Sequence, residues 1–412
     1  MAGCAGQESQ GLVRLVFSHW EDSEVLKRQI RRFNDRNRGA LEVTLRLAPA
    51  DTSQYFEKLR IEFQADEADA DVISGDVIWP AQFAANGWIS DLSGLFTDAL
   101  RELYLPATID SNTYEGRAYG VPWFTDAGML YYRADLLEES GFSGPPETWE
   151  EMREMVERVR RERDTKYGFV FQGAEYEGGV VNGLEFIWNS GGDVLDPRDP
   201  EKVAVASPKS VAGLETARGL VSEGVAPGAV PSYKEYESYA VFLNGDAVFM
   251  RNWPNVYARA ADPSLSNVEQ ERIGVAPLPV AHPGSPAHSG LGGWNLMVNA
   301  ASEEKTEAAW AFIRYLTAPA QQKERALEGG YLPTRKDCYE DEEILSRVPV
   351  IALGREAIRN VRSRPVTPLY HDVSLAMAER FHASLAGTVA PERAAATLRD
   401  ALEEILDRAE GL

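Results

Sequence analysis

Strand and helix patterns alternate along the first part of the chain. Three stretches have the short apolar or alternating pattern of strands, and they lie at residues 12–17, 41–47 and 72–76. Between the first two, Leu26, Ile30 and Phe33 recur at i, i+4 and i+7, the spacing of a helix with one buried face. A second helix is expected over about 53–64. This order predicts a βαβαβ unit.

The alternation continues along the chain and predicts an α/β fold with largely parallel sheets. Thr148 and Glu151 have the spacing of a capping box at the start of a helix. Further strands are expected at 167–171 and 247–250, and the chain beyond residue 334 is mainly of helical type. No Gly-x-Gly-x-x-Gly segment follows a strand, so we do not expect a dinucleotide site.

Length and charge narrow the class of protein. A chain of 412 residues exceeds the size at which one hydrophobic core stops growing, so two lobes are expected. The 42 basic residues are outnumbered by 64 acidic ones, and the net charge of −22 repels nucleic acids and anionic lipid headgroups. We therefore exclude nucleic-acid partners. Hydrophobic residues make up 44% of the chain, but no apolar run approaches the roughly 20 residues of a membrane-spanning helix.

The cysteine and histidine content excludes several kinds of chemistry. Two cysteines, Cys4 and Cys338, are too few for a disulfide framework, and the five histidines show no metal-ligand spacing. No metal site, cofactor or catalytic thiol is expected. Cys4 lies in Met-Ala-Gly-Cys-Ala-Gly, which resembles the end of a bacterial lipoprotein signal. We expect lipidation of Cys4, with residues 1–11 as a tether; a chance match of so few residues is the alternative.

Two aspartates stand beside strands and suggest a binding site. Asp126 follows Trp123 and precedes the apolar strand 129–132, where burying its charge is costly unless a ligand or neighbour donates hydrogen bonds to it. Asp76 ends an earlier strand. In open α/β sheets, ligands bind beyond the carboxyl ends of strands, so the two carboxylates are expected to face one cleft. The alternative is that each aspartate caps the following helix.

Tryptophan, glycine and arginine mark further candidate positions. Trp253 follows the strand at 247–250, and the glycine-rich segment 290–294 precedes a strand expected at 295–298. Glycines there allow a ligand or a hinge close to the backbone, and a similar segment at 329–333 marks another crossing between lobes. Arg364 lies in a proline-stiffened loop that suits bidentate hydrogen bonding to a ligand, although an ordinary surface arginine is the alternative.

Six segments in this order resemble the sugar-binding solute-binding proteins of ABC importers, within the trehalose and maltose binding group. They are residues 75–92, 119–137, 250–257, 291–298, 331–335 and 363–370. The resemblance implies a type II periplasmic-binding fold, in which two α/β lobes joined by three hinge crossings close on a ligand. The implied lobes are 12–125 plus 295–333 and 126–294 plus 334–412.

The resemblance also implies roles for particular residues. Asp76 and Asp126 correspond to carboxylates that bind sugar hydroxyls, Trp253 and Trp294 to stacking platforms, and Arg364 to a loop arginine that binds the disaccharide. The remaining members of the implied site are Glu21 or Asp22 above the ligand, Gly292, Gly293 and Tyr370, and two departures from the group's pattern, Phe124 and Asn255, which each stand where the group commonly has a tyrosine or other aromatic hydroxyl.

The expected function follows from this set. Vicinal hydroxyls suit ionised carboxylates, and the C–H faces of sugars suit flat indole rings. We expect a bacterial, monomeric, non-enzymatic protein that binds an α-linked glucose disaccharide such as trehalose or maltose. Its other partners would be the membrane subunits of an ABC permease, and it would sit outside the cytoplasm, anchored to the outer face of the membrane through Cys4.

Alternative functions remain open at this point. The ligand could be another oligosaccharide or glucoside. A glycoside hydrolase also uses two carboxylates, here a pair among Glu21, Asp22, Asp76 and Asp126, but the chain lacks an eight-fold βα repeat. Tryptophan with aspartate also suits a cationic solute such as a polyamine or glycine betaine, an option that Arg364 disfavours.

Overall fold

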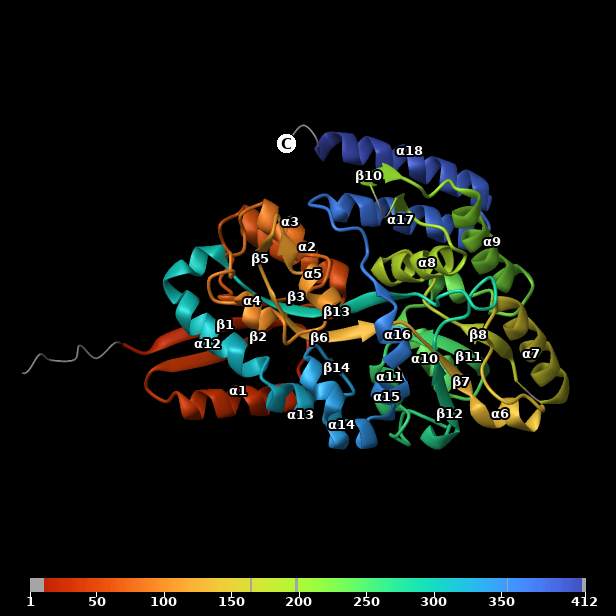
Figure 1. Cartoon of the computed structure of the whole chain (residues 1–412), viewed down its shortest axis with the longest axis horizontal. Coiled ribbons are helices and arrows are strands. Elements are labelled where there is room, and N and C mark those ends of the chain that lie inside the picture. The colour runs from red at the N-terminus through yellow and green to blue at the C-terminus, as the bar shows by residue number, and fades with distance from the viewer. Residues whose placement is uncertain (1–10, 164, 197–198, 354, 410–412) are drawn as a thin grey trace, which may run out of the picture.

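Two β-sheets with helices packed around them form two neighbouring lobes (Figure 1). The computed structural model describes residues 11–163, 165–196, 199–353 and 355–409. Cys4 and the expected tether lie outside these residues, apart from Gly11. Within the described part of the chain, no helix is both long and apolar enough to span a bilayer.

The first lobe begins with the expected βαβαβ unit, which is confirmed. Its elements are β1 (Val13–His19), α1 (Glu24–Arg36), β2 (Leu41–Leu47), α2 (Thr52–Gln64) and β3 (Val72–Asp76). β1 lies between β2 and β3 and is parallel to both. Ser23 caps α1, because its side chain accepts a hydrogen bond from the Leu26 amide, and Asp51 caps α2 in the same way.

Strands from later parts of the chain complete this sheet. They are β6 (Val121–Ala127), β13 (Ser289–Val298), β14 (Leu332–Pro333) and β15 (Val361–Arg362). The order is β14-β6-β13-β3-β1-β2, with β15 beside β13. β13 is antiparallel to both β3 and β6. The prediction of largely parallel sheets is therefore wrong, because β13, which returns from the other lobe, runs against both of its neighbours β3 and β6.

The second lobe is built on a four-stranded sheet. Its strands are β12 (Ile273–Ala276), β7 (Met129–Arg133), β11 (Ala247–Asn252) and β8 (Tyr167–Val170), in that order across the sheet. Only the β11–β8 pair is parallel among the pairs of this sheet in the described residues. α7 (Trp149–Glu162) begins with the expected capping box of Thr148 and Glu151.

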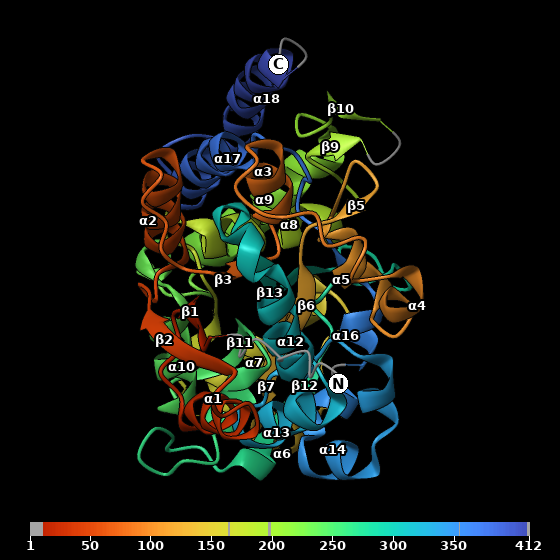
Figure 2. The same ribbon diagram turned by 90° about the vertical axis from the view of Figure 1, so that its left-hand side faces the viewer.

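Helices make up most of the rest of the molecule, and α17 and α18 lie together at one end of it (Figures 1 and 2). The remaining helices are α3 (Pro80–Ala85), α4 (Asp98–Arg101), α5 (Pro106–Asp110), α6 (Ala134–Glu139), α8 (Glu177–Asn189), α9 (Pro208–Ser222), α10 (Glu235–Leu243), α11 (Asn255–Arg259), α12 (Thr306–Leu316), α13 (Pro319–Gly329), α14 (Glu342–Arg347), α15 (Pro349–Leu353), α16 (Arg355–Arg359), α17 (Tyr370–Leu385) and α18 (Pro391–Ala409). The short elements are β4 (Thr113–Tyr114), β5 (Arg117–Ala118), β9 (Leu195–Asp196), β10 (Asp199–Val203), η1 (Val230–Ser232), η2 (Gln270–Arg272), η3 (Ala300–Lys305) and η4 (Lys336–Glu340).

Separate hydrophobic cores distinguish the two lobes. One core draws its buried residues from the segments 15–124 and 294–331, around the first sheet. Three others lie around the second sheet and among α8, α9, α17 and α18. The chain thus passes between lobes more than once, while the lobe boundaries expected from the sequence stay a prediction.

The glycine-rich crossing differs from expectation. Residues 290–294 do not precede a strand but are part of the ten-residue β13. Gly293 has a φ of 117°, and a Cβ atom there would lie 2.4 Å from the Phe124 carbonyl oxygen. The pairing with β6 shifts register between Trp294 and Asn295. Only glycine fits this bulged contact between two central strands.

Candidate functional site

The first sheet brings half of the predicted site residues together on three adjacent strands. Trp294 on β13 pairs with Asp76 on β3 and with Phe124 on β6. Gly292 pairs with Asp126 on β6, and Gly293 lies between Gly292 and Trp294 on β13. The register therefore places two carboxylates and an indole side by side where the strands pass between the lobes.

Asp126 is a carboxyl group in a poorly solvated position. Its Oδ1 atom has no hydrogen-bond partner in the part of the chain that the structure describes. Burial and the nearby Asp76 carboxylate raise the pKa of Asp126 to about 8, even though Arg251 and Arg325 favour its charged form. At neutral pH the ligand-free carboxyl is therefore mostly protonated, and it has an unused hydrogen-bonding capacity.

Arg364 joins the two lobes through a pair of carboxylates. It is 4% exposed, its Nη2 donates to Asp76 Oδ1 at 2.8 Å, and its Nη1 donates to Glu177 Oε1 at 2.6 Å. Tyr370 donates to the same Glu177 oxygen at 2.6 Å, and Ser374 donates to the other. Burial raises the pKa of Asp76, although Arg364 opposes this shift. Arg364 is a buried bridge and not a surface side chain.

Trp253 lies near Asp126, and protein side chains already contact the edge and one face of its ring. Its Nε1 donates to Glu235 Oε1 at 3.3 Å, and the Arg251 guanidinium lies 4.0 Å from its ring centroid. A Cβ atom on Gly292 would lie 3.0 Å from the Trp253 ring and 3.0 Å from the Cβ atom of Asp126. Gly292 is thus the residue that lets Trp253 and Asp126 lie close together.

Trp294 is more deeply packed than its expected platform role suggests. It is 7% exposed and lies in an aromatic cluster with its ring centroid 5.8 Å from Trp20, 6.0 Å from Tyr55 and 5.5 Å from Trp79. Phe124 is also buried and packs against Tyr331 at 4.6 Å.

The structure separates the two candidate acids after β1. Glu21 accepts hydrogen bonds from Arg325 at 3.1 Å and from Tyr331 at 2.8 Å, and its carboxylate lies 3.6 Å from His19. Burial opposes its ionisation, but Arg325, His19 and Tyr331 outweigh this and lower the pKa of Glu21 to about 2. Asp22 instead pairs with Lys27 at 2.7 Å and is half exposed. Of the two acids, only Glu21 is joined to the surroundings of Asp126, because Arg325 donates to Glu21 and also acts on the Asp126 carboxyl.

Asn255 lies beside the glycine-rich segment 329–333. It opens α11, and its Cα atom would lie 3.6 Å from a Cβ atom on Gly330, the residue directly after α13, which has a φ of 68°. Tyr331, the next residue, donates to Glu21. Asn255 is therefore linked to the site through the third crossing.

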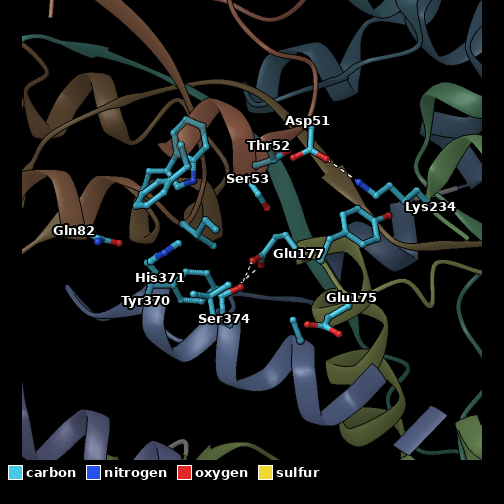
Figure 3. Close-up of a pocket in the computed structure, with 16 residues that line it drawn as sticks. Asp51, Thr52, Ser53, Gln82, Glu175, Glu177, Lys234, Tyr370, His371 and Ser374 are labelled. Atoms are coloured by element: carbon cyan, nitrogen blue, oxygen red, sulfur yellow. Dashed lines mark hydrogen bonds and ion pairs between the residues drawn. The ribbon is translucent and has the colours of Figure 1, made fainter. Parts of the chain in front are cut away.

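A pocket of about 280 Å³ opens beside this cluster, between helices of the two lobes (Figure 3). Tyr370 is the predicted site residue that lines it. Lys234 and Asp51, which directly precede α10 and α2, form an ion pair of 2.8 Å across its edge. The lining residues are Asp51, Thr52, Ser53, Phe56, Ile78, Trp79, Gln82, Glu175, Tyr176, Glu177, Lys234, Tyr370, His371, Ser374, Leu375 and Ala378.

Sequence reasoning missed three polar side chains of this region. Glu177 holds Arg364 and Tyr370, while Tyr176 donates to Glu235 Oε2 at 2.7 Å. Glu235 lies in the segment 235–239, whose pattern predicts only an amphipathic helix face. The available signal was weak, because these residues lie at helix starts and not at the strand ends that mark the other candidates.

The site contains no arrangement suited to a metal ion. Within residues 11–163, 165–196, 199–353 and 355–409, no group of three or more His, Cys, Asp or Glu side chains is placed to hold one. Its polar groups are mainly carboxylates, hydroxyls and the guanidinium groups of Arg251, Arg325 and Arg364, set among aromatic rings. Such a set complements a neutral polyhydroxylated molecule.

Comparison with known proteins decides the family. Residues 21–323 match the model of the family described as bacterial extracellular solute-binding protein. The chain belongs to this family. The solute-binding family and the type II periplasmic-binding fold expected from the sequence are confirmed.

Individual relatives cover nearly the whole chain. A Deinococcus radiodurans protein described as a probable ABC transporter-binding protein is 37% identical over 374 residues, which cover 89% of this chain and 87% of the relative. The structure of maltose-bound T. maritima MalE3 is 36% identical, with a TM-score of 0.88, and covers 95% of this chain and 99% of that one. The GacH receptor of Streptomyces glaucescens has the same fold at 22% identity, with a TM-score of 0.85 and coverage of 96% and 98%.

Proposed function

We propose that this solute-binding protein is the sugar-binding component of an ABC importer and holds an α-linked glucose disaccharide, such as maltose or trehalose, between its lobes. The observation that carries the proposal is the strand register, which sets Asp76 and Asp126 beside Trp294, with Trp253 and Arg364 in contact with the same group. The maltose-bound relative at 36% identity supports it.

The chemistry of the site fits this ligand class. Asp76, Asp126 and Glu177 offer carboxylate oxygens to hydroxyl groups, and Arg364 offers donors to hydroxyl or ring oxygens. Arg251 lies against one face of the Trp253 ring, and the apolar side of a pyranose ring would stack on the opposite face. Hydrogen bonds to charged groups contribute about 1.5–3 kcal/mol each, so a few of them with stacking support micromolar binding after ordering costs.

The cellular role extends this proposal. A solute-binding component delivers its sugar to the membrane subunits of the permease, so we place the protein outside the cytoplasm as a monomer that does not turn over its ligand. Lipidation at Cys4 would anchor it to the outer face of the membrane. Mass spectrometry of protein from the native membrane fraction tests the anchor, since an unmodified Cys4 there contradicts it.

A ligand screen tests the function. Thermal unfolding is measured with maltose, trehalose, sucrose, putrescine and glycine betaine, because a ligand at 100 times its Kd stabilises the native state by about 2.7 kcal/mol. Stabilisation by maltose or trehalose alone supports the proposal. Stabilisation only by the cationic solutes contradicts it, and release of free glucose from maltose during long incubation indicates a hydrolase instead.

A longer α-glucoside is a second candidate, and the pocket beside the carboxylates favours it. The pocket of about 280 Å³ has aromatic rings and acidic groups in its lining and adjoins Glu177 and Tyr370. Space beyond the disaccharide would admit a further sugar unit. Titrations with maltose and maltotriose separate the two candidates, because a third glucose unit bound in this pocket would give maltotriose the lower Kd.

A further inference from the structure

A buried ion pair lies behind the platform residue Trp253. Arg251 and Glu185 are 2% and 4% exposed at their side chains and form two parallel hydrogen bonds, Nε to Oε2 at 2.7 Å and Nη2 to Oε1 at 2.6 Å. The third guanidinium nitrogen, Nη1, donates to Gln172 Oε1 at 3.0 Å. The guanidinium is therefore fixed in plane by a fork of contacts that a lysine cannot reproduce.

The same guanidinium supports the Trp253 ring. Its carbon lies 4.0 Å from the ring centroid, well inside the range of a cation–π contact. Glu235 holds the indole N–H at 3.3 Å, and the Tyr131 hydroxyl donates to the Trp253 carbonyl oxygen at 2.8 Å. Among these contacts, Arg251 is the one that acts on the plane of the ring.

The ion pair also touches two connections between the lobes. The Gly290 amide on β13 donates to Glu185 Oε1 at 2.9 Å. At the link between β6 and β7, a Cβ atom on Gly128 would lie 2.1 Å from Glu185 Oε1 and 2.5 Å from Arg251 Nη2. The pair thus fills the space between both connections and the back of Trp253.

We propose that Arg251 is a positioning residue that fixes the ring plane of Trp253 from behind and, through Glu185, ties that ring to the two lobe connections at Gly128 and Gly290. The inference rests on the proposed function in so far as Trp253 stacks on a sugar. Arg251 itself does not touch the ligand in this account; it sets the orientation of the surface on which the ligand lies.

A double-mutant cycle measures this indirect role. Calorimetry with maltose compares wild type, Arg251→Lys, Trp253→Ala and the double variant. Arg251→Lys is expected to weaken maltose binding about tenfold in the wild-type background and less than twofold when Trp253 is already alanine, because a residue that acts through the ring has nothing left to act on. Equal losses in both backgrounds would overturn the proposal.

A measurement without sugar keeps the inference separate from the proposed function. The chain has nine tryptophans, and the indole N–H signal of Trp253 in a ¹⁵N spectrum is assigned by its loss in Trp253→Phe. Arg251→Lys should shift or broaden this signal and leave that of Trp310, in the other lobe, unchanged. An unchanged Trp253 signal overturns the proposal, whereas a wild type that binds none of the sugars contradicts only the proposed function.

Two further variants complete the experiment. Arg158→Lys is the matched control, since the Arg158 guanidinium lies 5.2 Å from the centroid of another aromatic ring in the same lobe, that of Phe142. This variant should change neither the maltose affinity nor the Trp253 signal. If Arg251→Lys does not fold, Glu185→Gln takes its place. That variant keeps the shape of the pair, removes the charge that holds Arg251, and should show the same signal change and the same non-additivity with Trp253→Ala.

Discussion

Asp126 shows at the scale of one residue how a costly side chain indicates a ligand. A carboxyl group with an unpaired Oδ1 and a pKa raised to about 8 is poorly placed in the ligand-free protein. Hydroxyl groups that donate to it favour its ionised form, so bound sugar should lower this pKa. Binding and proton release at Asp126 are then linked.

Proton release is therefore predicted on sugar binding near neutral pH. The ligand-free carboxyl is mostly protonated below about pH 8 and the bound one is ionised, so maltose affinity should rise from pH 6 to pH 8 and level off above it. Calorimetry in buffers of different ionisation enthalpy measures the proton count directly. Proton uptake, or a wild-type pH profile no different from that of Asp126→Asn, contradicts this assignment.

Asp126→Asn should also stabilise the ligand-free protein at high pH. Since the raised pKa means that the native state holds a proton that the unfolded state lacks between about pH 4 and 8, this residue's contribution to stability falls as the pH rises through that window. Asparagine has no charge to bury. Thermal unfolding at pH 9 is expected to give the variant the higher Tm, and a lower Tm at that pH would refute the account of Asp126.

Arg364→Lys is predicted to weaken maltose binding about tenfold or more. Arg364 spans Asp76 and Glu177 with two separate nitrogens, and a lysine offers one point of charge instead of a fork. Arg362→Lys is the control, because Arg362 pairs with Asp193 and lies over Trp188 instead. Calorimetric Kd values that rise equally for the two variants would show that Arg364 has no special role.

At the scale of elements, β13 organises the site. It pairs with both β3 and β6, so Asp76, Asp126 and Trp294 owe their proximity to its register. Gly293 makes this register possible, because its φ of 117° and its contact with the Phe124 backbone exclude a side chain. A substitution of Gly293 should therefore act mainly by weakening the pairing of β13 with β6, and not by removing a contact to the ligand.

Gly293→Ala is predicted to lower the free energy of unfolding by about 3 kcal/mol, since strain at positive φ is joined by a backbone clash at 2.4 Å. Gly116→Ala separates the two causes, because Gly116 also has a positive φ, but an added Cβ atom there would meet no other atom within 4 Å. It should cost about 1 kcal/mol. If urea unfolding gives the same loss of unfolding free energy for both variants, the contact between Gly293 and the Phe124 backbone has no effect.

Local sequence patterns predicted the helices and strands better than they predicted which strands and side chains contact each other. The spacing of Leu26, Ile30 and Phe33, like the Thr148 cap, depends on neighbours within one or two turns. The structure has both of the helices that these patterns predict, α1 and α7. The antiparallel pairing of β13 with both β3 and β6 depends on contacts between distant segments, which no local pattern encodes. Glu177 was missed for the same reason: its partners Arg364 and Tyr370 lie nearly two hundred residues away along the chain.

For the whole molecule, contacts across the pocket bear on closure of the lobes. Lys234 on one side pairs with Asp51 on the other at 2.8 Å, and His371 Nε2 lies 3.3 Å from Glu57 Oε1. Arg364 joins the lobes more deeply through Asp76 and Glu177. A sugar that contacts both lobes at once should add to these interactions and shift the population toward the closed state.

Lys234→Met is predicted to weaken maltose binding by no more than about fivefold, because exposed ion pairs contribute at most about 1 kcal/mol. The difference from wild type should vanish in about 1 M salt, where the Debye length is about 3 Å. Lys166→Met serves as control, since Lys166 pairs with Asp246 within one lobe. A loss that is independent of salt would mean that the Lys234–Asp51 pair does not assist closure.

We propose above all that a solute-binding protein with this carboxylate and tryptophan cluster binds an α-linked glucose disaccharide. Isothermal titration of the full chain with maltose, and then with trehalose, tests it most directly. We predict saturable binding at one site per chain for at least one of the two sugars, with a Kd in the micromolar range or tighter. No heat of binding with either sugar at millimolar concentration would contradict it.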